Sequence, residues 1–198
     1  MLRQLGPALR FTIFFTVLTG LVYPGIVTGL TQMFFPHRAN GSMIVVNGQV
    51  VGSSLIGQNF TKAEYFQPRP SAAGNGYDAT ASAGSNYGPT NQKLIDRVKT
   101  SVDQFRKDNP DYAGQIPADL VTASASGLDP DISPASAQAQ APRVAKVRGI
   151  ALGEVRQLIA QNTQGRTLGF LGEPRVNVLE LNLALDRQFL MKSAAAKP

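Results

Sequence analysis

Two carboxylates are the most chemically suggestive side chains in this sequence. Asp129 and Asp131 flank Pro130, and a pair of carboxylates at this spacing could act as a general acid and a general base. Ser126 and Ser133 lie close by in the sequence, and Asp, Ser and Pro together are typical of a capped, hydrogen-bonded loop. We favour the loop interpretation over a catalytic one.

Most other kinds of catalytic site are excluded by composition. The one histidine, His37, directly follows a long apolar stretch, so the folded domain has no Ser-His-Asp triad. The chain has no cysteine, which excludes disulfides, thiolate nucleophiles and zinc–cysteine sites. No lysine lies three residues after a serine, and no Gly-x-x-x-x-Gly-Lys-Ser/Thr loop is present to hold phosphates. We therefore predict no catalytic residues, no metal site and a chain that is not itself an enzyme.

The positive charge of the chain does not indicate nucleic acid. The formal net charge is +6, but the lysines and arginines are spread along the sequence. They form no run of four, and the aromatic residues are not interleaved with them as in a groove for single strands. We predict no nucleic-acid partner.

An uncharged stretch from Phe11 to Pro36 precedes most of the chain and is long enough to cross a membrane. As a helix its 26 residues would reach about 39 Å, more than the ~30 Å of a bilayer's hydrocarbon core. A cleaved signal peptide is the alternative, but its apolar core is shorter, about 7–15 residues, and small residues follow at the cleavage site. Here the stretch ends in Met33-Phe34-Phe35-Pro36 without an Ala-x-Ala pattern, which favours an uncleaved anchor in membrane lipid.

The cations on either side of this stretch predict its orientation. Arg3 and Arg10 precede it, whereas after Arg38 the next cation is Lys62. Short loops rich in Lys and Arg stay in the cytoplasm. We therefore predict a cytoplasmic segment 1–10, a transmembrane helix 11–36 and an extracytoplasmic domain 37–198.

Three glycines in the predicted span, Gly20, Gly25 and Gly29, indicate a surface for packing against another helix. Gly25 and Gly29 are four residues apart, so they share a helix face on which a second helix can approach closely. Pro24 removes a backbone hydrogen bond and predicts a kink. Glycine and proline are also commoner in membrane helices in general, so a partner helix is one of two open interpretations.

The remainder of the chain mixes strand and helix signals. Two β-branched runs around Asn47-Gly48 predict a hairpin over 44–51. Helical periodicity or capping predicts helices over residues 91–107, 133–140 and 151–161. Three further segments are less regular: a short strand at 120–122, a separate segment from Pro142, and residues 176–190, which fit either strand or helix. The fold class is a single N-terminal transmembrane helix followed by a mixed α/β exported (periplasmic) domain.

Four stretches resemble those of one known family in order and spacing. They are Leu55–Phe60, a Gly- and Ser-rich loop from Pro70 to Asn91, Ser126–Pro134 and Arg175–Asn182. The chain resembles the C subunit of the bacterial Kdp potassium-transporting ATPase from its apolar stretch to about Asp186.

This resemblance implies an accessory subunit of an ATP-driven potassium importer in the bacterial inner membrane. The implied partners are a channel-like potassium-translocating subunit, a P-type ATPase subunit and a small single-span membrane peptide. The family is described as needed for assembly and as a catalytic chaperone that raises the affinity of the ATPase subunit for ATP. The resemblance implies that Gln58 contacts ATP, although a glutamine in Leu-Ile-Gly-Gln is by itself more typical of a structural turn.

The predicted topology conflicts with direct ATP binding, because nucleotide is cytoplasmic. We therefore expect coupling through the assembled membrane part, by biasing a conformation of the ATPase subunit. Two other interpretations stay open from the residues: a membrane-anchored extracytoplasmic hydrolase that uses Asp129 and Asp131, and a tethered binding module.

Overall fold

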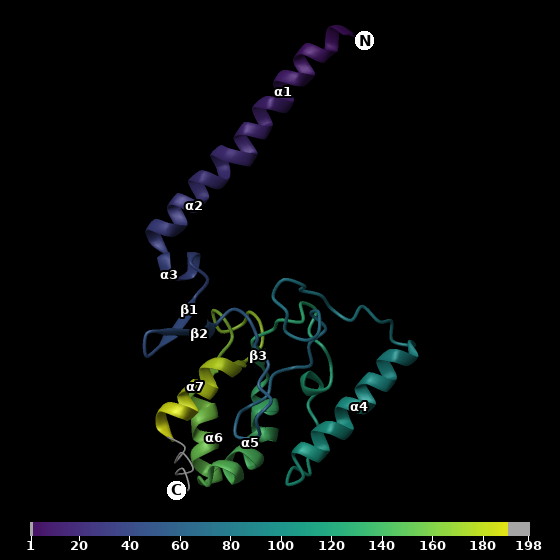
Figure 1. Cartoon of the computed structure of the whole chain (residues 1–198), viewed down its shortest axis with the longest axis vertical. Coiled ribbons are helices and arrows are strands. Elements are labelled where there is room, and N and C mark those ends of the chain that lie inside the picture. The colour runs from purple at the N-terminus through teal and green to yellow at the C-terminus, as the bar shows by residue number, and fades with distance from the viewer. Residues whose placement is uncertain (1, 190–198) are drawn as a thin grey trace, which may run out of the picture. The chain divides into compact units, whose positions relative to one another are not determined.

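The computed structural model describes residues 2–189 of the chain, which divides into two compact units, Met1–Ser53 and Ser54–Pro198 (Figure 1). The boundary falls after the predicted hairpin. The hairpin is therefore grouped with the N-terminal helix and not with the larger α/β unit.

The N-terminal unit is dominated by one long apolar helix. A 3₁₀ turn η1 (Leu2–Gln4) leads into α1 (Leu5–Val17), a π turn η2 (Leu18–Val22) and α2 (Tyr23–Phe34), and a short helix α3 (Pro36–Ala39) follows. Between residues 2 and 189, Leu5–Phe34 is the single helix long and apolar enough to cross a membrane, and none of its apolar window is buried within the chain. It begins at Leu5 rather than Phe11, so Arg10 lies inside the helix.

A π turn directly precedes Pro24, and the predicted kink stays a prediction. The N–H of Tyr23 donates to the carbonyl of Leu18, five residues back, and Pro24 is then among the first residues of α2. Pro24 has no N–H to donate, so the preceding turn loses one hydrogen bond. The helix nevertheless continues through the proline to Phe34.

The hairpin predicted at 44–51 is confirmed. Strands β1 (Met43–Val46) and β2 (Gln49–Ser53) pair antiparallel. The turn residues Asn47 and Gly48 both have positive φ, 50° and 78°, as the favoured two-residue hairpin turn requires.

The larger unit is a mixed helix and sheet structure, as predicted. Its helices are α4 (Gln92–Asp108), η3 (Ala118–Leu120), α5 (Pro134–Arg148), α6 (Leu152–Gln161) and α7 (Val178–Gln188). Three short strands, β3 (Asp131–Ile132), β4 (Thr163–Gln164) and β5 (Arg175–Asn177), form an antiparallel sheet in the order β3-β5-β4.

The helices at 91–107 and 151–161 are confirmed as α4 and α6, but two other predictions are wrong. Residues 120–122 were expected as a strand, whereas the chain forms the 3₁₀ turn η3 up to Leu120. The helix expected at 133–140 continues through Pro142 as α5 and ends at Gly149, which has a left-handed φ of 66°. The ambiguous segment 176–190 contains both elements, β5 and then α7, and its last residue, Leu190, lies outside the described residues.

The main core lies between α5, α6, α7 and the sheet. Fully buried side chains from each element meet there, including Ile132, Val144, Val155, Val176 and Leu181. A smaller cluster of Phe105, Leu120 and Ala139 joins the C-terminal end of α4 to α5. The long irregular segment 54–91 contributes Phe66 to the main core, and polar contacts hold much of the rest.

Candidate functional site

The loops that carry the family resemblance lie against one another. The hydroxyl of Ser71 donates to the carbonyl of Gly127 at 2.6 Å, and the hydroxyl of Ser82 donates to the carbonyl of Ser126 at 2.9 Å. The N–H of Gly57 donates to the carbonyl of Leu128 at 2.8 Å. Residues 55–60, 69–84 and 124–134, which we call the loop cluster, therefore form one hydrogen-bonded unit.

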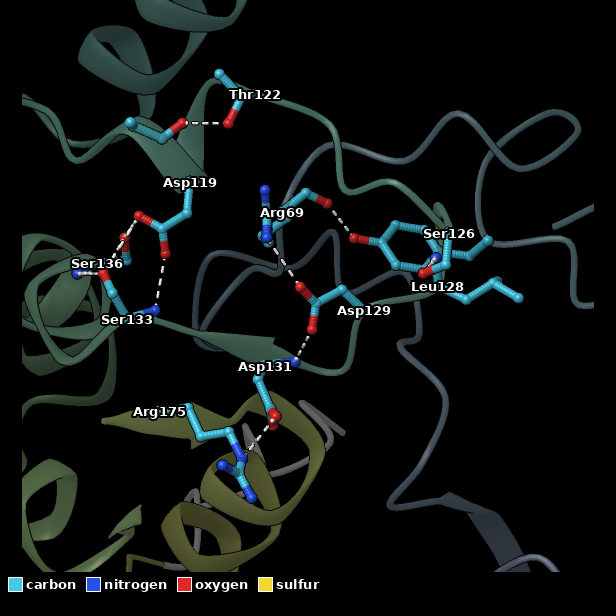
Figure 2. A network of polar contacts seen from close by, with 12 residues as sticks. Arg69, Asp119, Thr122, Ser126, Leu128, Asp129, Asp131, Ser133, Ser136 and Arg175 are labelled. Carbon is cyan, nitrogen blue, oxygen red and sulfur yellow. Dashed lines mark hydrogen bonds and ion pairs between the residues drawn. The ribbon is translucent and has the colours of Figure 1, made fainter. Parts of the chain in front are cut away.

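Figure 2 shows that the two carboxylates singled out by sequence act within this loop cluster as anchors. Asp129 accepts from the guanidinium of Arg69 at 2.9 Å and, through its other oxygen, from the N–H of Asp131 at 3.0 Å. Asp131 forms an ion pair with Arg175 of β5 at 3.1 Å. Both carboxylates thus have cationic partners in other segments of the domain, as in a hydrogen-bonded loop.

A third carboxylate, Asp119, was not identified from the sequence. It accepts from the N–H of Ser133 at 2.7 Å and from the hydroxyl of Ser136 at 2.5 Å (Figure 2). The hydroxyl of Ser133 in turn accepts from the N–H of Ser136 as the N-cap of α5. Asp119 thus joins η3 to the start of α5, and adds negative charge where the helix dipole favours it.

Burial of Asp131 makes the stability of the domain depend on pH. Burial and the nearby charge of Asp129 raise the pKa of Asp131 above its ordinary value, and Arg175 only partly offsets them. A carboxyl whose pKa is raised by folding contributes stability below its unfolded pKa and loses that contribution as pH rises through its folded pKa. The stability of the wild type relative to an Asp131→Asn variant should therefore fall as pH rises from strongly acidic toward neutral, measured by urea unfolding. A relative stability that rises over this range would contradict the assignment.

Close contacts explain why the loop cluster contains glycine at two positions. A Cβ on Gly57 would lie 2.5 Å from the carbonyl oxygen of Asp129. Gly127 has a φ of 69°, and a Cβ there would lie 2.6 Å from the nitrogen of Ala73 and 2.7 Å from the oxygen of Ala83. The backbones of the loops approach each other at distances that exclude a side chain.

We expect Gly127→Ala to lower the free energy of unfolding by about 2–3 kcal/mol, because it adds backbone strain to a steric overlap with main-chain atoms. The matched control is Gly153→Ala in α6, where nothing lies within 4 Å of the added Cβ. That variant should stabilise by about 0.5–1 kcal/mol, since alanine favours a helix over glycine. Urea unfolding followed by circular dichroism measures both. Equal effects of the two substitutions would show that the loops are not closely packed.

Gln58 lies next to this packed glycine. Its side chain is partly buried, and its neighbours Asn59, Phe60 and Thr61 line a groove of about 450 Å³ beside Arg69 and Tyr77. Burial raises the pKa of Tyr77, whose hydroxyl donates to the carbonyl of Arg69. The predicted contact of Gln58 with ATP stays a prediction.

Two of the three glycines of the span, Gly25 and Gly29, lie one α-helical turn apart on one face of α2. Gly20 lies inside η2, five residues before Gly25. Among residues 2–189, no atom outside the local helix backbone lies within 4 Å of a Cβ built on any of the three. The predicted packing of these glycines against a partner helix stays a prediction.

A second polar network, also missed from the sequence, holds residues 63–67. Arg143 of α5 is buried and donates to the carbonyls of Ala63 and Tyr65, and its other nitrogens donate to the side-chain oxygens of Asn109 and Gln140. Burial lowers the pKa of this guanidinium. A single side chain thereby supplies donors to an otherwise irregular segment.

Side-chain amides complete this network. We call the segment 63–67 together with Arg143, Gln140 and Asn182 the backbone clamp. Asn182 of α7 accepts from the N–H of Phe66 at 2.8 Å and donates to its carbonyl at 2.9 Å. Gln140 of α5 does the same for Gln67, at 2.8 and 3.0 Å. Each amide pairs with the backbone as a neighbouring strand would, so the buried Phe66 needs no sheet partner.

Arg148 adds an ion pair at the edge of the clamp. Its guanidinium contacts Asp186 at 2.7 Å, donates to the carbonyl of Glu64 and lies over the ring of Tyr65. The hydroxyl of Tyr65 donates to the other oxygen of Asp186 at 2.9 Å. Burial and this carboxylate raise the pKa of Tyr65.

Within residues 2–189 no group of three or more His, Asp or Glu side chains is placed to hold a metal ion. The described features define a class of protein: one candidate membrane span with an exposed glycine face, joined to a compact α/β domain whose unusual polar residues serve as anchors. Comparison with known proteins identifies the family.

A family model described as "K+-transporting ATPase, c chain" matches residues 5–187. A relative from Myxococcus xanthus is 59% identical over 183 residues, which cover 92% of this chain and 87% of the relative. Relatives from Koribacter versatilis and Mycobacterium tuberculosis are 56% and 57% identical, covering 94% of this chain and 95% and 100% of their own. All three are named "Potassium-transporting ATPase KdpC subunit". The chain belongs to the KdpC family, the c chains of K+-transporting ATPases.

Proposed function

We propose that this chain is an accessory subunit of an ATP-driven potassium importer and has no catalytic role of its own. The observation that carries the proposal is the family match, which extends over both structural units, from residue 5 to residue 187. The ion pairs of Asp129 and Asp131 support the non-catalytic part, because they assign these carboxylates to the architecture of the loops.

The proposed topology has a cytoplasmic N-terminus and a periplasmic domain in the bacterial inner membrane. Arg3 and Arg10 precede most of the apolar helix, in agreement with the distribution of cations around membrane spans. The proposed partners are a channel-like potassium-translocating subunit, a P-type ATPase subunit and a small single-span peptide. The exposed glycine face of α2 suits the first of these contacts, since small residues let membrane helices approach closely.

We propose that any effect on ATP affinity is indirect. A periplasmic domain and a cytoplasmic nucleotide are on opposite sides of the bilayer, so Gln58 would act on the assembly of the complex. Binding of the subunit would favour a conformation of the ATPase subunit that holds ATP better, and ATP would by reciprocity strengthen binding of the subunit.

The test is purification of the full chain in mild detergent from cells short of potassium, followed by mass spectrometry. Recovery of a P-type ATPase together with a channel-like potassium subunit is the expected result. Recovery of the chain alone would contradict the proposal and favour the tethered enzyme or binding module.

A further inference from the structure

The connection between β4 and β5 presents three large apolar side chains to solvent. Leu168, Phe170 and Leu171 are 79%, 68% and 49% exposed, and every residue from 164 to 174 is exposed. Isolated exposed apolar residues are ordinary in soluble domains, but three within four residues form a patch that calls for a partner.

The turn that carries them is closed by backbone hydrogen bonds. Thr167 and Leu171 exchange two backbone hydrogen bonds of 2.9 Å. The guanidinium of Arg166 donates to both carboxylate oxygens of Glu173, at 2.9 and 2.8 Å. Leu168 has a φ of 54°, a left-handed conformation that is unfavourable for a bulky residue. A strained backbone that points apolar side chains outward indicates a functional constraint on this tip, which we define as Leu168–Leu171.

The connection that bears the tip ends close to the point where the larger unit begins. The side-chain amide of Asn177 donates to the carbonyl of Ser54, the first residue of the larger unit, at 2.9 Å. Asn177 and Arg175 are the two ends of β5, about 7 Å apart, and the connection that bears the tip ends at Arg175. Residues 35–53 link this point to the apolar helix. The connection that bears the tip is therefore attached next to the residue at which the larger unit begins.

We propose that the tip inserts its apolar side chains into the interface of the bilayer that holds the chain's own helix. The tip is a projecting turn, and lipid accepts a projection of this kind without a complementary groove. Arg166 and Arg175 at its base pair with Glu173 and Asp131, so charged groups of both signs border the apolar side chains. The inference rests on the membrane anchorage in the proposed function.

The chain has no tryptophan, so a single substitution supplies a unique fluorophore. The probe is full-length Phe170→Trp in vesicles of phosphatidylethanolamine and phosphatidylglycerol, with and without bromine on the acyl chains. Phe14→Trp in the apolar helix is the control for membrane insertion. Tyr87→Trp, at an exposed aromatic position elsewhere in the domain, is the control for a solvated tryptophan.

The expected result is a blue-shifted Phe170→Trp emission that is quenched by bromine near the headgroups more than by bromine deep in the chains. Tyr87→Trp emission should not change with brominated lipid. Quenched Phe14→Trp with an unquenched, water-exposed Phe170→Trp would overturn the proposal while leaving the anchor intact. Quenching of neither would overturn the anchor itself. Protection of Phe170→Trp only after the partner subunits are added would assign the tip to a protein and also contradict insertion into lipid.

Discussion

Replacing Arg143 with methionine is expected to lower the free energy of unfolding of the α/β domain by about 3–5 kcal/mol. The guanidinium is buried and serves four acceptors, among them the carbonyls of Ala63 and Tyr65. Methionine fills most of the same space but donates no hydrogen bond, so these buried oxygens lose their partners. Removal of the buried charge offsets part of this cost, because burial already disfavours the charged guanidinium.

The matched control is Arg156→Met, at an exposed position of α6. Its effect should stay within about 0.5 kcal/mol, as for most surface substitutions. Both variants can be compared with the wild type by urea unfolding of the detergent-solubilised chain, followed by circular dichroism. If Arg143→Met unfolds at the same urea concentration as Arg156→Met, the segment 63–67 is held by Gln140 and Asn182 without the arginine.

The elements that local signals specify could be predicted from the sequence. Helix α4 has an amphipathic pattern and an N-cap, Asn91, whose side chain accepts from the N–H of Lys93. The hairpin follows from Asn47-Gly48, because its turn needs positive φ at both positions. In both cases the determining residues are neighbours in the chain, so no knowledge of tertiary packing is required.

The prediction at Pro142 was wrong because tertiary packing outweighed a local rule. A proline inside a helix removes one hydrogen bond and usually ends it. Here Ala137, Ala141, Val144 and Ala145 from both sides of Pro142 are buried in the main core. Breaking the helix would remove half of these contacts, so α5 continues through the proline.

The backbone clamp could not be predicted, because its partners are far apart in the sequence. Asn182 pairs with Phe66 across 116 residues, and Gln140 pairs with Gln67 across 73. The available signal was a polar residue at a position where helical spacing places the core, such as Asn182 beside Leu181 and Leu185. A pattern of this kind indicates a buried hydrogen bond but does not identify the group that receives it.

The loop cluster shows a similar limit. The resemblance identified residues 55–60, 70–91 and 126–134 as unusual, yet composition does not say which loops meet. The loops can pack together because Gly127 has a positive φ and because neither Gly57 nor Gly127 carries a Cβ. The need for glycine at these positions can be recognised only when the facing loop is known. Asp129 and Asp131, the two candidate catalytic carboxylates, form ion pairs with Arg69 and Arg175 that join these loops to the rest of the domain.

A double substitution of Gly25 and Gly29 by leucine is expected to abolish association of the chain with its membrane partners. Two leucines would keep a partner helix from approaching the backbone closely, and close packing is one source of the attraction between membrane helices. Recovery of the ATPase complex with the tagged chain should fall by about tenfold or more, equivalent to about 1.4 kcal/mol or more of lost association. The readout is the amount of each subunit that purifies with the chain.

The control is Val27→Phe, which adds comparable bulk two residues from each glycine and therefore on the opposite side of the helix. It should leave recovery unchanged, and unchanged recovery with the double leucine variant would contradict packing through the glycine face.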